Sequence, residues 1–236
     1  MQALWKICFP EDDEGFICRF FENIPVNTGF VACKGDVLAM LFLLPAQVLF
    51  TEAAIPVRYL YAGCTHPEHR RQGLYPALMT FAAEQAASEG AKAIYLHPAD
   101  DSLADYYRRL GYRDGIGSWQ CSGEAASSFT EVTPEEYVTG RQAYFPGNMP
   151  VWRLDTPYER LFLQEMVADG WLPGQFSEGC ALLSPDYTVL YDCLTKAPGI
   201  IDSARWNNTA QWIPIGDLPL PELAEQPGYT AFLGDI

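Results

Sequence analysis

One short segment, Cys64 to Tyr75, constrains this chain more than any other, because it reads as a strand end, a turn and a helix start. It carries two adjacent arginines, Arg70 and Arg71, and has Gly73 directly before the helix. A helix begins with backbone N–H groups that lack partners within the helix and with a partial positive charge. Such a turn therefore suits a phosphate or pyrophosphate. Two surface arginines near a turn are more often solvated, so the surrounding elements must decide between these interpretations.

The elements around this turn form a strand, helix, strand unit. Residues 57–65 are rich in valine, tyrosine and leucine and predict a strand, and residues 93–97 predict another. A helix is expected between them, ending at Gly90 in a left-handed cap. Its predicted apolar face consists of Leu74, Leu78, Phe81 and Ala82. Right-handed crossovers make two such strands parallel neighbours in one sheet.

Most of the remaining chain also divides into short helices and strands. Helices are predicted at 4–8, at 12–24, from Thr133, and from Thr156 to Gly170. Hairpins are predicted from 30–34 with 37–44 and from 180–183 with 187–194, and single strands at 115–121 and 229–233. The region around Trp206 and Trp212, with the proline-rich stretch 214–227, predicts an irregular packed segment.

One further helix is expected between Ser102 and Gly111. Ser102 would open it, with Asp105 three residues on completing a capping box. The predicted apolar stripe consists of Leu103, Tyr106, Tyr107 and Leu110. On the residues alone, Tyr107 is more simply interpreted as a core tyrosine than as a catalytic one.

Two motifs in this region resemble those of the GNAT superfamily of acyl-CoA-dependent N-acyltransferases. Residues 70–75, R-R-Q-G-L-Y, are similar to the acyl-CoA loop Q/R-x-x-G-x-G/A, and Thr65-His66-Pro67 to the V-x-P that commonly precedes it. Residues 100–112, D-D-S-L-A-D-Y-Y-R-R-L-G-Y, are similar to N-x-x-A-x-x-x-Y-x-x-x-G-F. The resemblance covers roughly residues 28–121. Within the family, residues 67–74 are most similar to those of the enhanced-intracellular-survival type. Tyr75 and Asp100 depart from the motifs.

The resemblance implies a fold class and a donor. It implies an α+β fold, with a GNAT-like central mixed sheet flanked by helices and a smaller C-terminal α+β region. It also implies acetyl-CoA as the acyl donor, with its pyrophosphate on the amides of 71–75 and its pantetheine paired with the strand end. The cofactor-binding residues would be Gly63, Cys64, Thr65, Arg70, Arg71, Gln72, Gly73, Leu74, Tyr75, Asp100 and Ser102.

The resemblance further implies direct attack by a primary amine, with Tyr107 as the general acid for the departing thiolate. Backbone amides near 62–64 would stabilise the oxyanion. Because no covalent intermediate is needed, Cys64 is expected to be a small buried strand residue rather than a nucleophile. The general base stays unassigned among His97, Asp100 and the Ile236 carboxylate. The rival interpretation is a non-catalytic acyl-CoA-binding or sensing module, and a third is an interaction protein with an ordinary surface loop.

Composition excludes other classes of protein. The formal net charge of −15 argues against a nucleic-acid partner, which requires a positive surface. The acidic excess falls mostly after residue 115, where it would attract a cationic amine or simply favour solubility. Three scattered histidines and seven cysteines without a C-x-x-C pair predict no metal site and reduced thiols.

Localisation and domain organisation follow from the same patterns. Because no long apolar run or secretory leader is recognised, we expect a soluble, cytoplasmic protein without a membrane partner. The small-residue stretch 122–128 predicts a linker between a GNAT domain at 1–121 and a smaller region at 122–236, which would be a shortened or degenerate GNAT half. Oligomeric state and the acceptor amine have no readable signal.

Overall fold

The computed structural model describes residues 1–50, 52–122, 129–147, 149–176, 178–195, 205–216 and 227–230. The contacts among these residues divide the chain into two compact units. Unit 1 contains residues 1–47, 55–96 and 212–219, and unit 2 contains residues 48–54, 97–211 and 220–236. The predicted domain division at 121/122 stays a prediction. Within the described ranges, no helix is long and apolar enough to cross a bilayer.

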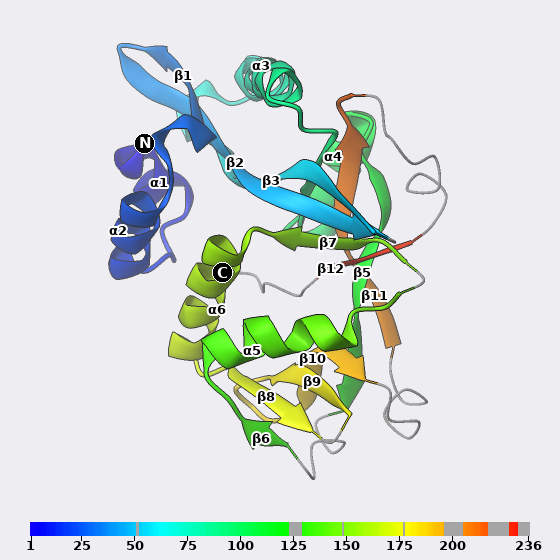
Figure 1. Cartoon of the computed structure of the whole chain (residues 1–236). Coiled ribbons are helices and arrows are strands. Elements are labelled where there is room, and N and C mark those ends of the chain that lie inside the picture. Colours follow the sequence, from blue (N-terminus) through cyan, green and yellow to red (C-terminus); the bar gives the residue numbers. More distant parts are fainter. Residues whose placement is uncertain are drawn as a thin grey trace. The chain divides into compact units, whose positions relative to one another are not determined.

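Unit 1 is a small sheet with helices on both faces (Figure 1). Strand β1 pairs antiparallel with β2, which neighbours β3, and β3 pairs parallel with β4. The predicted hairpin and the parallel strand pair are therefore confirmed. The elements in chain order are α1 Gln2–Cys8, α2 Glu14–Asn23, η1 Val26–Thr28, β1 Gly29–Lys34, β2 Asp36–Phe50, β3 Ala53–Thr65, η2 Pro67–His69, α3 Leu74–Ser88 and β4 Ala93–Leu96.

An aromatic cluster holds α1 and α2 against one face of this sheet. The Trp5 side chain is fully buried, and its ring centroid lies 4.8 Å from that of Phe20 and 5.8 Å from that of Phe42 on β2. Aromatic pairs at such separations stabilise a core beyond the area they bury. Asp13 caps α2 by accepting a 2.8 Å hydrogen bond from the Phe16 amide, which explains why the predicted helix begins there.

Helix α3 covers the opposite face of the sheet. Phe30 pairs with Leu41 in the β1–β2 ladder, and its ring contacts Phe81 of α3 at 6.2 Å. Since neighbouring residues on a strand point to opposite faces, Leu41 faces α3 and Phe42 faces α1 and α2. The predicted apolar face of α3 is partly wrong, because Phe81 is 59% exposed. The buried stripe is Leu78, Met79, Ala82 and Ala86, in which small alanines let the helix approach the sheet.

Unit 2 is a second sheet-containing unit, with strand order β7-β12-β5-β10-β9-β8-β6. Strand β12 pairs parallel with both β5 and β7, whereas the β10–β9 and β9–β8 pairs are antiparallel. The elements are α4 Asp101–Arg109, β5 Arg113–Ser122, β6 Thr130–Glu131, α5 Pro134–Gly140, η4 Arg141–Tyr144, β7 Val151–Leu154, α6 Thr156–Ala168, β8 Leu172–Phe176, β9 Gly179–Leu183, β10 Val189–Thr195, β11 Arg205–Pro214 and β12 Gly228–Thr230. The mixed sheets and helices give the predicted α+β class.

Three predictions for unit 2 are wrong: the cap of α4, the place of Leu103 in its apolar stripe, and the irregular structure around Trp206 and Trp212. The cap of α4 is Asp100, whose carboxylate accepts a 2.7 Å hydrogen bond from the Leu103 amide, and the predicted cap, Ser102, lies inside the first turn. Leu103 is exposed, and Ala104 and Tyr107 form the buried side. The segment containing Trp206 and Trp212 is the regular strand β11, not irregular structure. The predicted linker at 123–128 and residues 217–226 and 231–236 lie outside the described residues.

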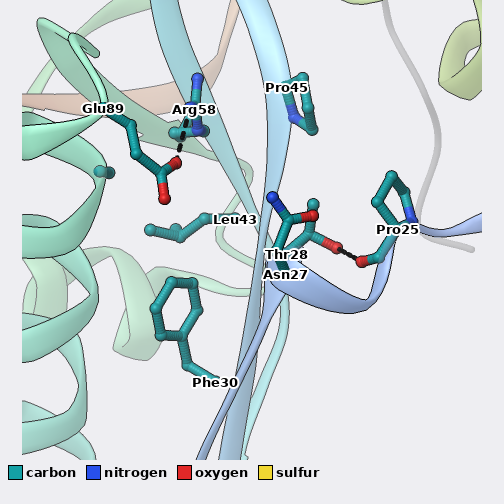
Figure 2. A pocket seen from close by; sticks show the side chains of 9 residues that line it. Pro25, Asn27, Thr28, Phe30, Leu43, Pro45, Arg58 and Glu89 are labelled. Carbon is teal, nitrogen blue, oxygen red and sulfur yellow. Dashed lines mark hydrogen bonds and ion pairs between the residues drawn. The ribbon is translucent and has the colours of Figure 1, made fainter.

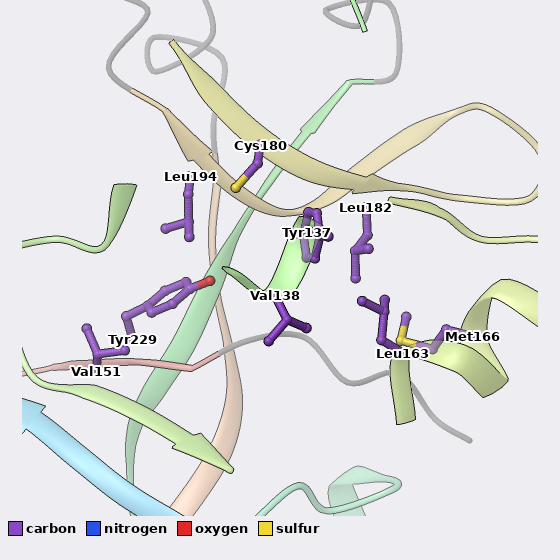
Figure 3. Close-up of a cluster of buried hydrophobic side chains, with 9 residues drawn as sticks. All are labelled: Tyr137, Val138, Val151, Leu163, Met166, Cys180, Leu182, Leu194 and Tyr229. Atoms are coloured by element: carbon purple, nitrogen blue, oxygen red, sulfur yellow. The ribbon is translucent and has the colours of Figure 1, made fainter. Parts of the chain in front are cut away.

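The apolar core of unit 2 packs α5, α6 and the strands around Tyr137, Leu163 and Tyr229 (Figure 3). Beside it lies a buried ion cluster. Glu159, which is 1% exposed, accepts hydrogen bonds from Arg141 at 2.7 Å and from Arg153 at 2.5 Å. Asp192 accepts from Arg141 at 2.7 Å and from the Tyr137 hydroxyl at 2.8 Å. Two arginines and two carboxylates thus balance one another inside unit 2.

Removing the charge of Glu159 should strongly destabilise unit 2. Glu159→Gln keeps the side-chain shape but leaves two buried guanidinium groups facing one carboxylate, so we expect a loss of about 3–5 kcal/mol in the free energy of unfolding. Urea denaturation measures it. The matched control is Glu135→Gln, which breaks a 2.8 Å pair with Arg160 where the Glu135 side chain is 69% exposed. That change should alter stability by less than about 1 kcal/mol. Equal stability of the two variants would contradict the expectation.

Candidate functional site

The turn between β3 and α3 has the backbone geometry of an anion site. After η2, Arg70 is extended, Arg71 is left-handed with φ 61°, and Gly73 is left-handed with φ 75°. Gly73 is the N-cap of α3, and no side chain caps this helix. The first N–H groups of a 15-residue helix are thus left for an external acceptor. The two left-handed residues therefore lie directly before the first turn of α3, where the partial positive charge of a helix N-terminus favours an anion.

Two cations flank these amides. Arg70 is exposed, and its Nε donates a 3.3 Å hydrogen bond to the carbonyl oxygen of Thr65, which ties the arginine to the end of β3. Arg71 is exposed, and among the described residues it makes no ion pair. Gln72 donates to the Glu68 carbonyl at 3.5 Å, closing the turn on its outer side. The structure therefore brings the predicted loop residues 70–75 together with Thr65 at the end of β3.

Strand β3 continues past its partner at this point. The β3–β4 ladder pairs Arg58 with Ile94 and Tyr59 with Tyr95. β4 ends one residue later at Leu96, whereas β3 extends to Thr65. Ala62, within this extension, is left-handed with φ 46°, a conformation that an L-residue adopts only at a cost. The end of β3 is therefore distorted and extends beyond β4, so its main-chain groups can pair with an extended ligand.

Gly63 leaves room for the side chain of Tyr75, which stands where the loop motif has a small residue. A Cβ at position 63 would lie 2.8 Å from Cζ and 3.1 Å from Cε2 of Tyr75, and closer still to its hydroxyl oxygen. The phenol therefore lies directly over the α-carbon of Gly63. Side chains on a helix point towards its N-terminus, so a residue in the first turn of α3 reaches back onto β3. The large side chain of Tyr75 on α3 therefore packs where Gly63 on β3 has no side chain.

Cys64 lies on the other face of the strand, beside α1. Cys8, at the end of α1, donates a hydrogen bond from its thiol to the Thr65 carbonyl at 3.6 Å. Burial raises the pKa of the Cys64 thiol, and the neighbouring Cys8 thiol raises it further. A thiol with a raised pKa is protonated at neutral pH and is a poor nucleophile. Cys64 is half-buried rather than buried, and its expected structural role stays a prediction.

Three predicted site residues, Asp100, Ser102 and Tyr107, lie in unit 2. Asp100 is occupied as the cap of α4, and Ser102 is exposed. Tyr107 is buried, and its ring contacts those of Tyr106 at 5.4 Å and Tyr112 at 5.3 Å. Because the turn between β3 and α3 belongs to unit 1, the grouping of these three residues with that turn in one site stays a prediction. The Ile236 carboxylate lies outside the described residues.

A separate pocket of about 180 Å³ lies at the other end of α3 (Figure 2). Phe30, Leu43 and Ala86 line it, together with Arg58, which donates a 3.2 Å hydrogen bond to Glu89. α3 rises about 1.5 Å per residue, so some 20 Å separates this pocket from the turn at Gly73. The pocket contains none of the predicted site residues.

Sequence reasoning missed the left-handed Ala62 and the Gly63–Tyr75 contact. Because positive φ is uncommon for alanine, nothing in the sequence predicted the left-handed conformation of Ala62. A glycine inside a strand marks a point where another group approaches the backbone closely. Gly63, together with the bulky Tyr75 at a motif position that is usually small, was therefore the available signal for their contact.

Comparison with known proteins places these features in a family. The model of the acetyltransferase (GNAT) domain family matches residues 1–115. No curated protein matches the chain. Three solved structures share the fold: a GCN5-related N-acetyltransferase from Kribbella flavida, another from Anabaena variabilis, and Eis1 from Mycobacterium abscessus.

The structural similarity covers most of this chain at low sequence identity. In the order given, identities are 12%, 14% and 11%, TM-scores are 0.60, 0.64 and 0.60, and 86%, 92% and 82% of this chain is covered. The chain spans 64%, 70% and 66% of those proteins, about two thirds of their length. Residues 1–115, which include the turn between β3 and α3, therefore match the acetyltransferase (GNAT) domain family, as the two motifs predict.

Proposed function

We propose that this protein transfers an acetyl group from acetyl-CoA to a primary amine. The observation that carries the proposal is the turn at Arg70–Tyr75, where left-handed Arg71 and Gly73 lead into a helix whose N-cap makes no side-chain hydrogen bond, next to the end of β3. Acetyl transfer in general is what the GNAT domain supports. The nature of the acceptor and the roles of single residues are our inference.

The donor would lie along the end of β3. Its pyrophosphate would bind the amides of residues 71–75 and the guanidinium groups of Arg70 and Arg71. Its pantetheine would pair with the main chain of Gly63, Cys64 and Thr65, where β4 has already ended. Amides at 62–64, displaced by the left-handed Ala62, are the candidates for polarising the thioester carbonyl.

The chemistry would be a direct displacement. The neutral amine nitrogen forms a bond to the acetyl carbon, the carbon–sulfur bond breaks, and the CoA thiolate takes a proton from Tyr107. The proton that the attacking nitrogen loses as it becomes an amide restores the Tyr107 hydroxyl, directly or through solvent. An unperturbed tyrosine has a pKa of about 10, so it holds a proton at neutral pH. Cys64 takes no part, because its raised pKa keeps the thiol protonated. The group that deprotonates the substrate ammonium stays unassigned.

The acidic composition favours a cationic acceptor. The formal net charge is −15, so an alkyl ammonium compound or a basic peptide would be drawn to the protein electrostatically. All seven cysteines are free, which fits a reducing compartment such as the cytoplasm.

Arg71→Ala should weaken CoA binding. Losing a charge-assisted contact to the pyrophosphate, worth about 1.5–3 kcal/mol, should raise the Kd for CoA roughly ten- to a hundredfold. Titration calorimetry measures it. Lys34→Ala is the control, because it removes the same charge from the exposed end of β1, outside the site. Equal affinities for the two variants would count against the turn as the pyrophosphate site.

Tyr107→Phe should lower turnover without weakening donor binding. Removal of a general acid is expected to reduce kcat by about 10²- to 10⁴-fold, while the Kd for acetyl-CoA stays near the wild-type value. Thiol release with acetyl-CoA and a panel of amines provides the rates. Tyr106→Phe removes a hydroxyl from the adjacent ring and should keep most of the turnover. An undiminished rate in Tyr107→Phe would remove this tyrosine from the mechanism.

The rival function, a non-catalytic acyl-CoA-binding or sensing module, is favoured by one observation. The Asp100 carboxylate stands where the family motif has asparagine, and it is engaged in capping α4. The same assay separates the two functions. Tight acetyl-CoA binding with no thiol release on any amine would support the sensor.

A further inference from the structure

Tyr75 covers one face of the strand end that we assign to the acyl donor. Its phenol lies over the α-carbon of Gly63, with Cζ 2.8 Å and Cε2 3.1 Å from where a Cβ would stand. Gly63 lies between the left-handed Ala62 and Cys64. Tyr75 is held in the first turn of α3, whose residues Leu78 and Ala82 are buried, so the backbone that carries the phenol is anchored.

The opposite face of the same strand end is closed as well. Cys64 is half-buried and its thiol is adjacent to that of Cys8, which also donates to the Thr65 carbonyl. Arg70 holds the same carbonyl from the turn. The end of β3 therefore has the phenol on one face and α1 on the other, and its edge towards β4 extends beyond Leu96.

We infer that Tyr75 determines which acyl groups the donor can carry. The inference rests on the proposed function, in which the thioester lies beside residues 62–64. A phenol over Gly63 forms a wall next to that position, so an acetyl group fits and a longer acyl chain meets the ring. A small residue at position 75 leaves the same space open. The departure from the family motif is thus a device for selectivity, and Gly63 is the residue that makes room for it.

The selectivity should appear in binding, without any need for turnover. Calorimetry gives the Kd values of free CoA, acetyl-CoA, butyryl-CoA and hexanoyl-CoA for the wild type, Tyr75→Ala and Tyr75→Phe. Each acyl-CoA affinity is divided by the same variant's affinity for free CoA, so any general weakening of the site cancels. Crowding by a single methylene changes discrimination by roughly tenfold or more. The wild type should therefore disfavour hexanoyl-CoA relative to acetyl-CoA by at least about that factor.

The two variants separate the ring from its hydroxyl. Tyr75→Phe keeps the wall and should discriminate as the wild type does, whereas Tyr75→Ala should bind the two acyl-CoAs within about threefold of each other. Loss of discrimination in Tyr75→Phe would overturn the steric role and assign the effect to the hydroxyl. Unchanged discrimination in Tyr75→Ala would overturn the inference while CoA binding, and with it the proposed function, stands. Absence of CoA binding in the wild type would overturn both.

A second pair of variants tests the contact from the strand side. Gly63→Ala places a methyl group where the phenol lies and should push the ring into the acyl position, lowering the affinity for acetyl-CoA relative to free CoA. The double variant Gly63→Ala/Tyr75→Ala removes the obstruction and should restore that ratio towards the Tyr75→Ala value. Additive effects of the two changes would mean that the two residues act separately, against the inference.

Discussion

The end of β3 and the turn into α3 form the constraint on which the rest of the site depends. A strand that extends beyond its partner and bends at a left-handed alanine has, among the described residues, no β4 neighbour beside its last residues. The turn that follows ends at Gly73, an N-cap that makes no side-chain hydrogen bond. Backbone polar groups need partners in a folded protein. In the proposed function, the extended amide arm and the diphosphate of the acyl donor supply partners for both segments.

The two compact units are stabilised by different interactions. Unit 1 depends on aromatic packing, in which Trp5 joins α1, α2 and β2 on one face while the small residues of α3 close the other. Unit 2 contains a buried cluster in which Glu159 and Asp192 neutralise Arg141 and Arg153. Buried ion pairs are rarely retained for stability alone, since apolar residues of similar volume often stabilise as well. The cluster instead ties η4, α6, β7 and β10 together at defined positions.

Local sequence patterns predicted structural features, whereas long-range contacts were not predicted. The helix start at Thr133, the helix ends at Gly90 and Gly170 and the parallel strand pair all depend on neighbours within a few residues or on a general rule of handedness. The burial of α3 was partly mispredicted because the apolar Phe81 contacts Phe30 of β1 and yet stays 59% exposed. The cap of α4 was wrongly predicted because Asp100 and Ser102 are both favourable N-cap residues. The sequence alone does not show after which of them the helix begins.

The sequence by itself determined the turn between β3 and α3, since a glycine at a helix start and flanking strands are local properties that any fold of this order must keep. It also predicted the resemblance of the first half of the chain to the GNAT domain, through two motifs at a fixed separation. Only the tertiary structure decided what lies against Tyr75, because contact with Gly63 requires α3 to fold back on β3. The same holds for the ion cluster of unit 2, whose partners Arg141 and Asp192 are 51 residues apart. Packing between distant segments depends on the whole set of side-chain shapes, and no local pattern encodes it.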